Sequence, residues 1–147
     1  MNSKMLVFII FYLLLFSCDK VEDCPKASTG PPYFFVEIVD SATNENVFTD
    51  GTYTENQLSV STYPLTSSFS YSFLSENNEN LISITPSWTE GVFKTTLKLD
   101  NQAVIPITTY IVKRESRCHT NYFIENLVID GFEYQIDVET GIYKIKI

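Results

Sequence analysis

The residues of this chain best suited to nucleophilic or metal chemistry are three cysteines and one histidine. His119 stands beside Cys118, and Ser116 is close by in the sequence. A catalytic serine or cysteine needs a base within hydrogen-bond reach and a third group that orients the base. No glycine-framed turn surrounds any serine, as it would in a nucleophile elbow, and one histidine with two cysteines is a poor zinc set. We therefore expect His119 to be a loop residue and the protein to be no enzyme and to bind no cofactor or metal.

Carboxylates are the remaining catalytic candidates. A glycosidase needs two acids that face each other across a cleft holding a sugar ring, whereas the acids of this chain are spread along its length. Glu133, Asp137 and Glu139 alternate with apolar residues, which predicts a solvated strand face rather than a catalytic pair.

An oxygen-rich segment, residues 40–51, could supply ligands to a calcium ion, which binds six to eight oxygens. The candidate ligands are Asp40, Asn44, Glu45 and Asp50. Their spacing does not follow the EF-hand loop, and polar turn residues explain the same composition without a metal. We expect a turn-rich loop here.

Three aromatic residues near predicted turns could stack on a ligand, namely Trp88, Tyr53 and Tyr63. An exposed ring on a rigid loop can pack on a sugar face or on a partner protein. Aromatic side chains of small β domains also fill the core, so the exposure of each ring decides between the two roles.

The candidate residues named above must be positioned by short runs in which apolar and polar residues alternate. In one run Phe69, Tyr71 and Phe73 alternate with serines, and in another Phe93, Thr95, Leu97 and Leu99 alternate with lysines and a threonine. Period-two alternation predicts strands with one buried face. Eight or nine such strands predict an all-β fold, an antiparallel β-sandwich of immunoglobulin-like or similar type, with a closed barrel as the alternative.

Two later stretches carry more specific predictions. The run 103–112 is apolar on both faces, which favours a central strand, but Pro106 lacks a ladder donor and favours an edge or a bulge. In the last third, 122–129 and 132–138 flank Asp130-Gly131, which predicts a hairpin with a type I′ turn and a β-meander. The side chains expected to face inward from its second strand are Phe132, Tyr134, Ile136 and Val138.

The chain begins with a segment typical of bacterial export signals. Lys4 precedes an uncharged apolar run, residues 5–15, which is too short to span a membrane as a helix of about 20 residues. The sequence Leu15-Phe16-Ser17-Cys18 resembles the lipobox of bacterial lipoproteins, although Phe16 is bulkier than the usual residue. This resemblance implies removal of residues 1–17 as a signal peptide and attachment of diacylglycerol to the Cys18 thiol, which anchors the protein in a membrane.

The segment after Cys18 predicts a tether. Its acidic start, Asp19-Lys20-Val21-Glu22-Asp23, is similar to the export signal of surface lipoproteins in Bacteroidetes-type bacteria. Residues 18–32 end in Gly30-Pro31-Pro32, so we expect the single folded domain to occupy 33–147. The two resemblances imply a lipid-anchored protein of the bacterial outer membrane, on the periplasmic or the cell-surface side.

Charge and cysteine count limit the partners. Removal of the signal takes away one basic residue and no acid, so the formal net charge changes from -8 to -9. Such a surface repels nucleic acid, whereas a protein or glycan partner in the envelope remains open. Once Cys18 is lipidated, Cys24 and Cys118 are left as an even pair in an oxidising compartment, which predicts a disulfide.

Together these features predict a lipid-anchored, non-catalytic binding or interaction module of the cell envelope, with an unknown ligand. Two alternatives stay open: a small envelope hydrolase acting on glycans, and a carbohydrate-binding accessory lipoprotein.

Replacing the lipidated residue tests this localisation. We expect Cys18→Ser to release the protein into the aqueous fraction or to block its processing, because no thiol remains to carry the lipid. Fractionation of the envelope measures this, with Cys24→Ser as the control that stays in the membrane. A Cys18→Ser variant that matures normally and remains in the membrane pellet would contradict the assignment.

Overall fold

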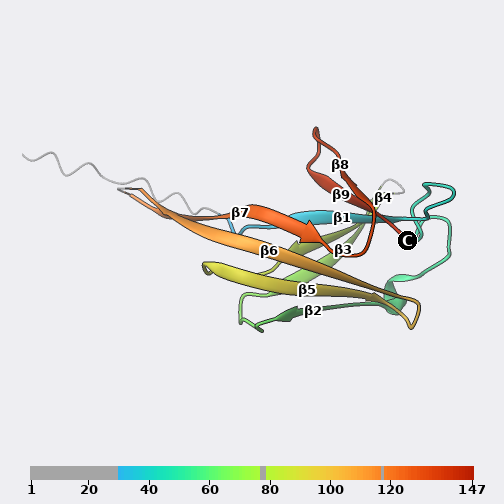
Figure 1. Ribbon diagram of the computed structural model, residues 1–147, viewed down its shortest axis with the longest axis horizontal. Coiled ribbons are helices and arrows are strands. Elements are labelled where there is room, and N and C mark those ends of the chain that lie inside the picture. The colour runs from blue at the N-terminus through green and yellow to red at the C-terminus, as the bar shows by residue number, and fades with distance from the viewer. Residues whose placement is uncertain (1–29, 77–78, 117) are drawn as a thin grey trace, which may run out of the picture.

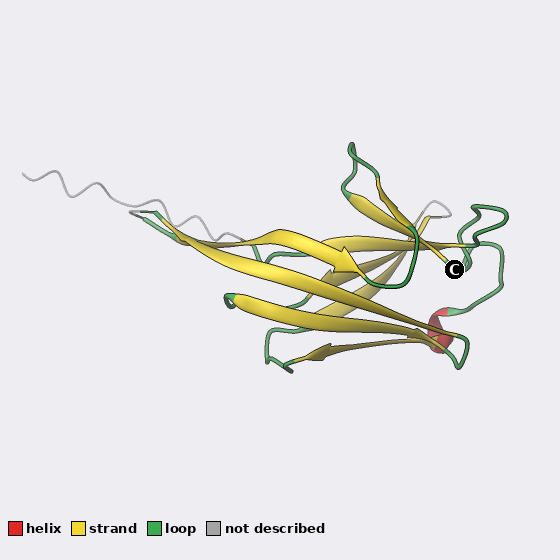
Figure 2. Ribbon diagram, viewed as in Figure 1, coloured by secondary structure: helices red, strands yellow, loops and turns green. Residues whose placement is uncertain are grey.

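The computed structural model describes residues 30–76, 79–116 and 118–147, and these ranges form an all-β domain of nine strands in two packed sheets (Figures 1 and 2). The predicted sandwich is confirmed, and no α-helix occurs in the described ranges. The strands are β1 (Phe34–Val39), β2 (Leu58–Tyr63), β3 (Ser70–Glu76), β4 (Glu79–Thr85), β5 (Gly91–Leu99), β6 (Ala103–Glu115), β7 (Thr120–Ile129), β8 (Tyr134–Ile136) and β9 (Ile142–Lys146), with one 3₁₀ turn at Glu55–Gln57.

The two sheets have the orders β3-β4-β1-β9-β8 and β2-β5-β6-β7. Neighbours pair antiparallel except for β1 and β9, which run parallel with Val36 opposite Tyr143 and Ile38 opposite Ile145. The prediction of a wholly antiparallel sandwich is therefore wrong at this pair. Period-two alternation carries no strand direction, so the sequence pattern reads the same for either orientation.

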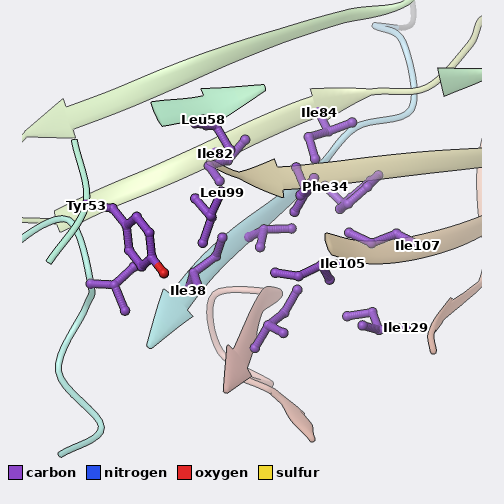
Figure 3. Close-up of a cluster of buried hydrophobic side chains, with 14 of the residues drawn as sticks. Phe34, Ile38, Tyr53, Leu58, Ile82, Ile84, Leu99, Ile105, Ile107 and Ile129 are labelled. Atoms are coloured by element: carbon purple, nitrogen blue, oxygen red, sulfur yellow. The ribbon is translucent and has the colours of Figure 1, made fainter. Parts of the chain in front are cut away.

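The core lies between the sheets and consists of the inward-facing residues, which alternate along the strands of both sheets (Figure 3). Because each branched or aromatic side chain leaves water on both sheets at once, burial at about 25 cal/mol per Å² holds the layers together. The fully buried aliphatic side chains are Val36, Ile38, Val47, Ile82, Ile84, Leu97, Leu99, Ile105, Ile107 and Ile145.

One face of strand β3 is less buried in the structure than its sequence pattern predicts. Phe69, just before the strand, and Phe73 are half-buried, but Tyr71 between them is exposed. The reason is position, since β3 is the edge of the five-stranded sheet and little of the opposite sheet covers it. Phe73 still packs edge-on against Phe48, with ring centroids 5.0 Å apart.

Strand β6 settles the conflict over Pro106. The strand lies between β5 and β7, so it is central, and its outward and inward positions alternate. Pro106 sits opposite Thr96 of β5, and its carbonyl accepts a hydrogen bond from Asp130 N at 3.1 Å on the other side. Strand β7 has ended at Ile129, opposite Ile107, so the missing N–H of the proline falls where the ladder stops.

The last third departs from the predicted meander. Strands β7 and β8 belong to different sheets, so residues 130–133 cross between the layers and Asp130-Gly131 is no hairpin turn. The hairpin is β8–β9, around Thr140-Gly141. Phe132 and Tyr134 do pack against the core, but Ile136 is half-exposed because β8 is a short edge strand. Val138 lies beyond the end of β8, in the turn to β9, and is 93% exposed.

The last strand should be essential for stability. We expect Ile145→Ala to lower the free energy of unfolding by about 2–5 kcal/mol, because it removes a fully buried side chain of β9 and leaves a cavity. Denaturant titration measures this. The matched control is Ile136→Ala on the neighbouring strand, where the side chain is half-exposed and a change within about 1 kcal/mol is expected. Equal effects of the two substitutions would show that β9 does not close the core.

Candidate binding surface

Tyr53 does not serve as a ligand platform. It is only 6% exposed and its hydroxyl donates to Gln102 Oε1 at 2.8 Å (Figure 3). Its backbone N–H also donates to the Val47 carbonyl at 2.9 Å, so the loop folds its ring over the end of the core. The predicted stacking role of Tyr53 is therefore wrong, because the loop carries its own hydrophobic residues inward.

Tyr63 and Trp88 lie at the opposite end from Tyr53 and are 75% and 47% exposed. Two hydrogen bonds join their loops, from Trp88 N to Ser68 Oγ at 3.0 Å and from Thr66 Oγ1 to the Pro86 carbonyl at 3.4 Å. The sequence-predicted pair thus comes together on one rigid end. The described chain also begins at this end, since Gly30 to Tyr33 lead into β1 (Figure 1). We call it the tether end and define it by the loops 64–69 and 86–90 and the tip of the β6–β7 hairpin.

A second exposed surface covers the four-stranded sheet on the side away from the core. Its centre consists of the outward side chains of β5 and β6, which pair across the ladder as Val92 with Tyr110 and Lys98 with Val104, beside Lys94. We call these five residues the outer face. The three apolar members are each between 39% and 54% exposed. The Val92–Tyr110 pair lies at one end of this face, and Val104 lies about 20 Å further along β6, beyond Thr108 and Pro106. Exposed apolar side chains that share one face of a sheet can mark an interaction surface.

The charge of the outer face is opposite to that of the whole protein. Lys94 and Lys98 are exposed, and no acid stands among the alternating outward residues of β5 and of β6 as far as Tyr110. The exposed acids nearest to this face are Glu125, at the bulge of β7 beside Tyr110, and Glu115 at the end of β6. Exposed acids such as Glu90 and Glu139 lie elsewhere, but six exposed or half-exposed acids share the loops around residues 40–57, 100 and 130, at the end of the sandwich farthest from the tether end. These acids are Asp40, Glu45, Asp50, Glu55, Asp100 and Asp130.

The sequence itself carries a signal for the outer face. The run 103–112 is apolar on both faces, which favours a central strand and also predicts apolar outward positions. In an antiparallel sheet with one wet face, outward positions are normally polar. Val104 and Tyr110 break that rule, and Val92 repeats the exception on β5.

Ser116 and His119 are hydrogen-bonded to each other, but the imidazole ring of His119 takes no part in these contacts. In the turn between β6 and β7, Ser116 Oγ donates to the His119 carbonyl at 2.9 Å, and the His119 backbone N–H donates to Ser116 Oγ at 3.2 Å. Both contacts use the backbone of His119. A general base would have to accept the serine proton on a ring nitrogen, so this arrangement is a turn and not a catalytic pair.

The acids of the last third stabilise the fold. Glu133 pairs with Lys146 at 2.7 Å, while Asp137 Oδ1 accepts the backbone N–H groups of Glu139 and Thr140 at 2.9 and 3.3 Å. These two hydrogen bonds, Glu139 first, hold the pKa of Asp137 below its usual value of 3.8. Asp137 thus caps the β8–β9 turn and does not lie on the predicted strand face.

The oxygen-rich segment uses its acids in turns as well. Asp40 Oδ1 accepts the N–H groups of Thr43 and Ala42, both at 2.8 Å, and these bonds lower the Asp40 pKa. Asp50 Oδ1 likewise accepts the Thr52 N–H at 2.7 Å. Within the described ranges no three His, Cys, Asp or Glu residues are grouped to hold a metal ion.

Three shallow hollows of about 350–380 Å³ lie elsewhere on the surface. One is lined by Val39, Asn44, Gln135, Lys144 and Lys146, and the other two lie between β1 and β7 around Tyr33 and Ile124. No carboxylate lines any of the three, so none offers the pair of acids that glycoside hydrolysis requires.

The predicted lipidation and disulfide involve residues outside the described part of the chain. Cys118 lies in the bend between β6 and β7, but Cys18 and Cys24 belong to residues 1–29, so both assignments stay predictions. Among the residues that the structure describes, no helix is long and apolar enough to cross a bilayer. Comparison with known protein families, with curated proteins and with solved structures finds no match.

Proposed function

We propose that the protein is a lipid-anchored, non-catalytic interaction module of the bacterial envelope, which binds a partner protein through the outer face. The observation that carries this proposal is the exposed apolar pair of Val92 and Tyr110, with Lys94 next along β5 and the Lys98–Val104 pair further along the same outward side. The anchor rests on the lipobox resemblance of residues 15–18.

The shape of the outer face favours a protein over a small ligand. Small molecules and short glycans are bound in concave sites that bury most of their surface, whereas these five residues lie on the outward side of two paired strands and line none of the three hollows described above. Protein interfaces combine an apolar, aromatic centre with a polar or charged rim. Tyr110 and Val92 supply the centre here, and the two lysines supply the rim.

Charge complementarity specifies the partner further. The outer face carries cations in a protein whose net charge is -8, or -9 after signal removal. A partner that presents acidic groups around an apolar contact gains attraction from Lys94 and Lys98, whereas another copy docked through its own outer face would place lysines against lysines.

A photo-reactive aromatic residue at Tyr110 tests this interaction in the full-length, membrane-bound protein. We expect light to produce one discrete cross-linked protein product in the cells that make it. The double substitution Lys94→Glu with Lys98→Glu should lower the yield about tenfold, which corresponds to about 1.4 kcal/mol of binding free energy.

The matched control places the same probe at Val138, which is exposed in the β8–β9 turn at the edge of the other sheet and should give no such product. Equal products from Tyr110 and Val138, or none from either, would refute a binding role for the outer face. A protease-resistant polysaccharide product would favour the carbohydrate-binding alternative, and a product of twice the mass would show self-association instead.

A further inference from the structure

We propose that the tether end rests on the lipid bilayer and orients the domain there. This inference rests on the proposed lipid anchor and goes beyond it, because an anchored domain could equally hang free on its tether. The contacting residues are Tyr63 at the end of β2, Leu65 of the β2–β3 loop, Trp88 of the β4–β5 loop, and Phe123 of β7.

The side chains at this end are of the kind that favours a membrane interface. Leu65 is 79% exposed, Tyr63 75%, and Trp88 47%, although the end of the sandwich could hold polar loops at no cost. Tryptophan and tyrosine concentrate at headgroup depth, where the ring is in an apolar layer and its polar atom reaches water.

The loops that carry these residues are fixed rather than loose. The Trp88 N–H donates to Ser68 of the neighbouring loop, and the fully buried Ser87 joins Thr89 through a 2.8 Å contact between hydroxyls. Fixed loops keep their exposed apolar side chains outward, because no local collapse onto the core is open to them.

The position of the lipid favours this end over the other. Twelve peptide steps separate Cys18 from Gly30, so the tether spans at most about 40 Å and, as a relaxed coil, about 20 Å. A nine-residue strand such as β5 spans about 30 Å. The acidic end could therefore reach the bilayer only if a nearly extended tether ran the length of the domain.

The distribution of charged residues also favours the tether end as the end that faces the bilayer. The six acids of the distal loops lie far from the tether end, which holds Glu90 and the ion pair of Lys113 with Glu115. Arg114 lies over the Phe123 ring, with 5.4 Å from its guanidinium carbon to the ring centroid. An arginine beside an aromatic ring can reach lipid phosphates while its stem and the ring stay at the apolar boundary.

The β6–β7 hairpin determines how the domain sits. Its ladder continues to Glu115 opposite Thr120, four residues beyond Ile111, which pairs with the first residue of β5. The hairpin therefore projects about 13 Å past that strand, as Figure 1 shows. A bilayer that touches the hairpin and both loops together is inclined to the strands, with the acidic end away from it.

A glycan is a poorer occupant of this surface. Tyr63, Leu65 and Trp88 line none of the three hollows described above, whereas Phe123 lines the one around Tyr33 and Tyr122. Exposed apolar and aromatic side chains spread over two loops and a strand suit a deformable, extended lipid interface better than a ligand that must be enclosed.

Tryptophan fluorescence tests the contact directly, because Trp88 is the only tryptophan in the chain. The full-length lipidated protein is placed in phosphatidylcholine and phosphatidylethanolamine vesicles that contain lipid brominated near the headgroup. We expect the bromine to quench most of the Trp88 emission and the emission maximum to lie at shorter wavelength than for the Cys18→Ser variant in buffer. The double substitution Tyr63→Ser with Leu65→Ser should reduce the quenching.

A moved tryptophan provides the matched control. In a Trp88→Phe background, Phe123→Trp should be quenched like Trp88, whereas Asn101→Trp, exposed in the β5–β6 turn at the acidic end, should not. An unquenched Trp88 in protein that floats with the vesicles would overturn the bilayer contact and leave the anchor intact, and so would equal quenching at positions 88 and 101. Wild-type protein that fails to float would overturn the anchor itself.

Discussion

The parallel pairing of β1 with β9 is the constraint on which the rest of the fold depends. It joins the first and last strands of the domain and places Ile38 and Ile145 side by side in the core. Strand β8 is attached to the five-stranded sheet only through β9, and the backbone of Ile147 exchanges hydrogen bonds with Val39 and Ser41. Without β9, strand β1 would lose its hydrogen-bonded neighbour on one side, and the sheet would keep only β1, β3 and β4.

This pairing also fixes how the surfaces are oriented. Strand β1 lies between two neighbours, and Pro32 just before it is buried, so the chain leaves the domain in one direction. The chain therefore leaves the domain at the tether end, where Trp88 and Leu65 lie. The outer face on β5 and β6 belongs to the other sheet and stays free of both the tether and the acidic end. In the proposed orientation a neighbouring envelope protein can therefore approach Tyr110 from the side while the domain remains on its bilayer.

The sequence predicts the strands well, because burial of one face in two is a local property. Phe93 to Leu99 alternate as expected and every inward residue is buried. Strand partners and direction are non-local, so the parallel β1–β9 pair and the crossing at Asp130-Gly131 could not be predicted from alternation. The same limit explains the aromatic residues: Tyr53 and Tyr63 both lie near turns, yet one loop folds back over the core and the other does not. For Val104 and Tyr110, the apolar outward positions were visible but had no assigned role.

Hydrogen exchange of the full-length protein tests the closure by β9 most directly. If the terminal strands hold one cooperative sandwich together, the amides of β9 that bond to β1 exchange as slowly as those of β5 and β6, at the rate set by global unfolding. Exchange of β9 at the fast rate of a frayed chain end, with β5 and β6 still protected, would contradict the account. In that case the core would not depend on the pairing of the first and last strands.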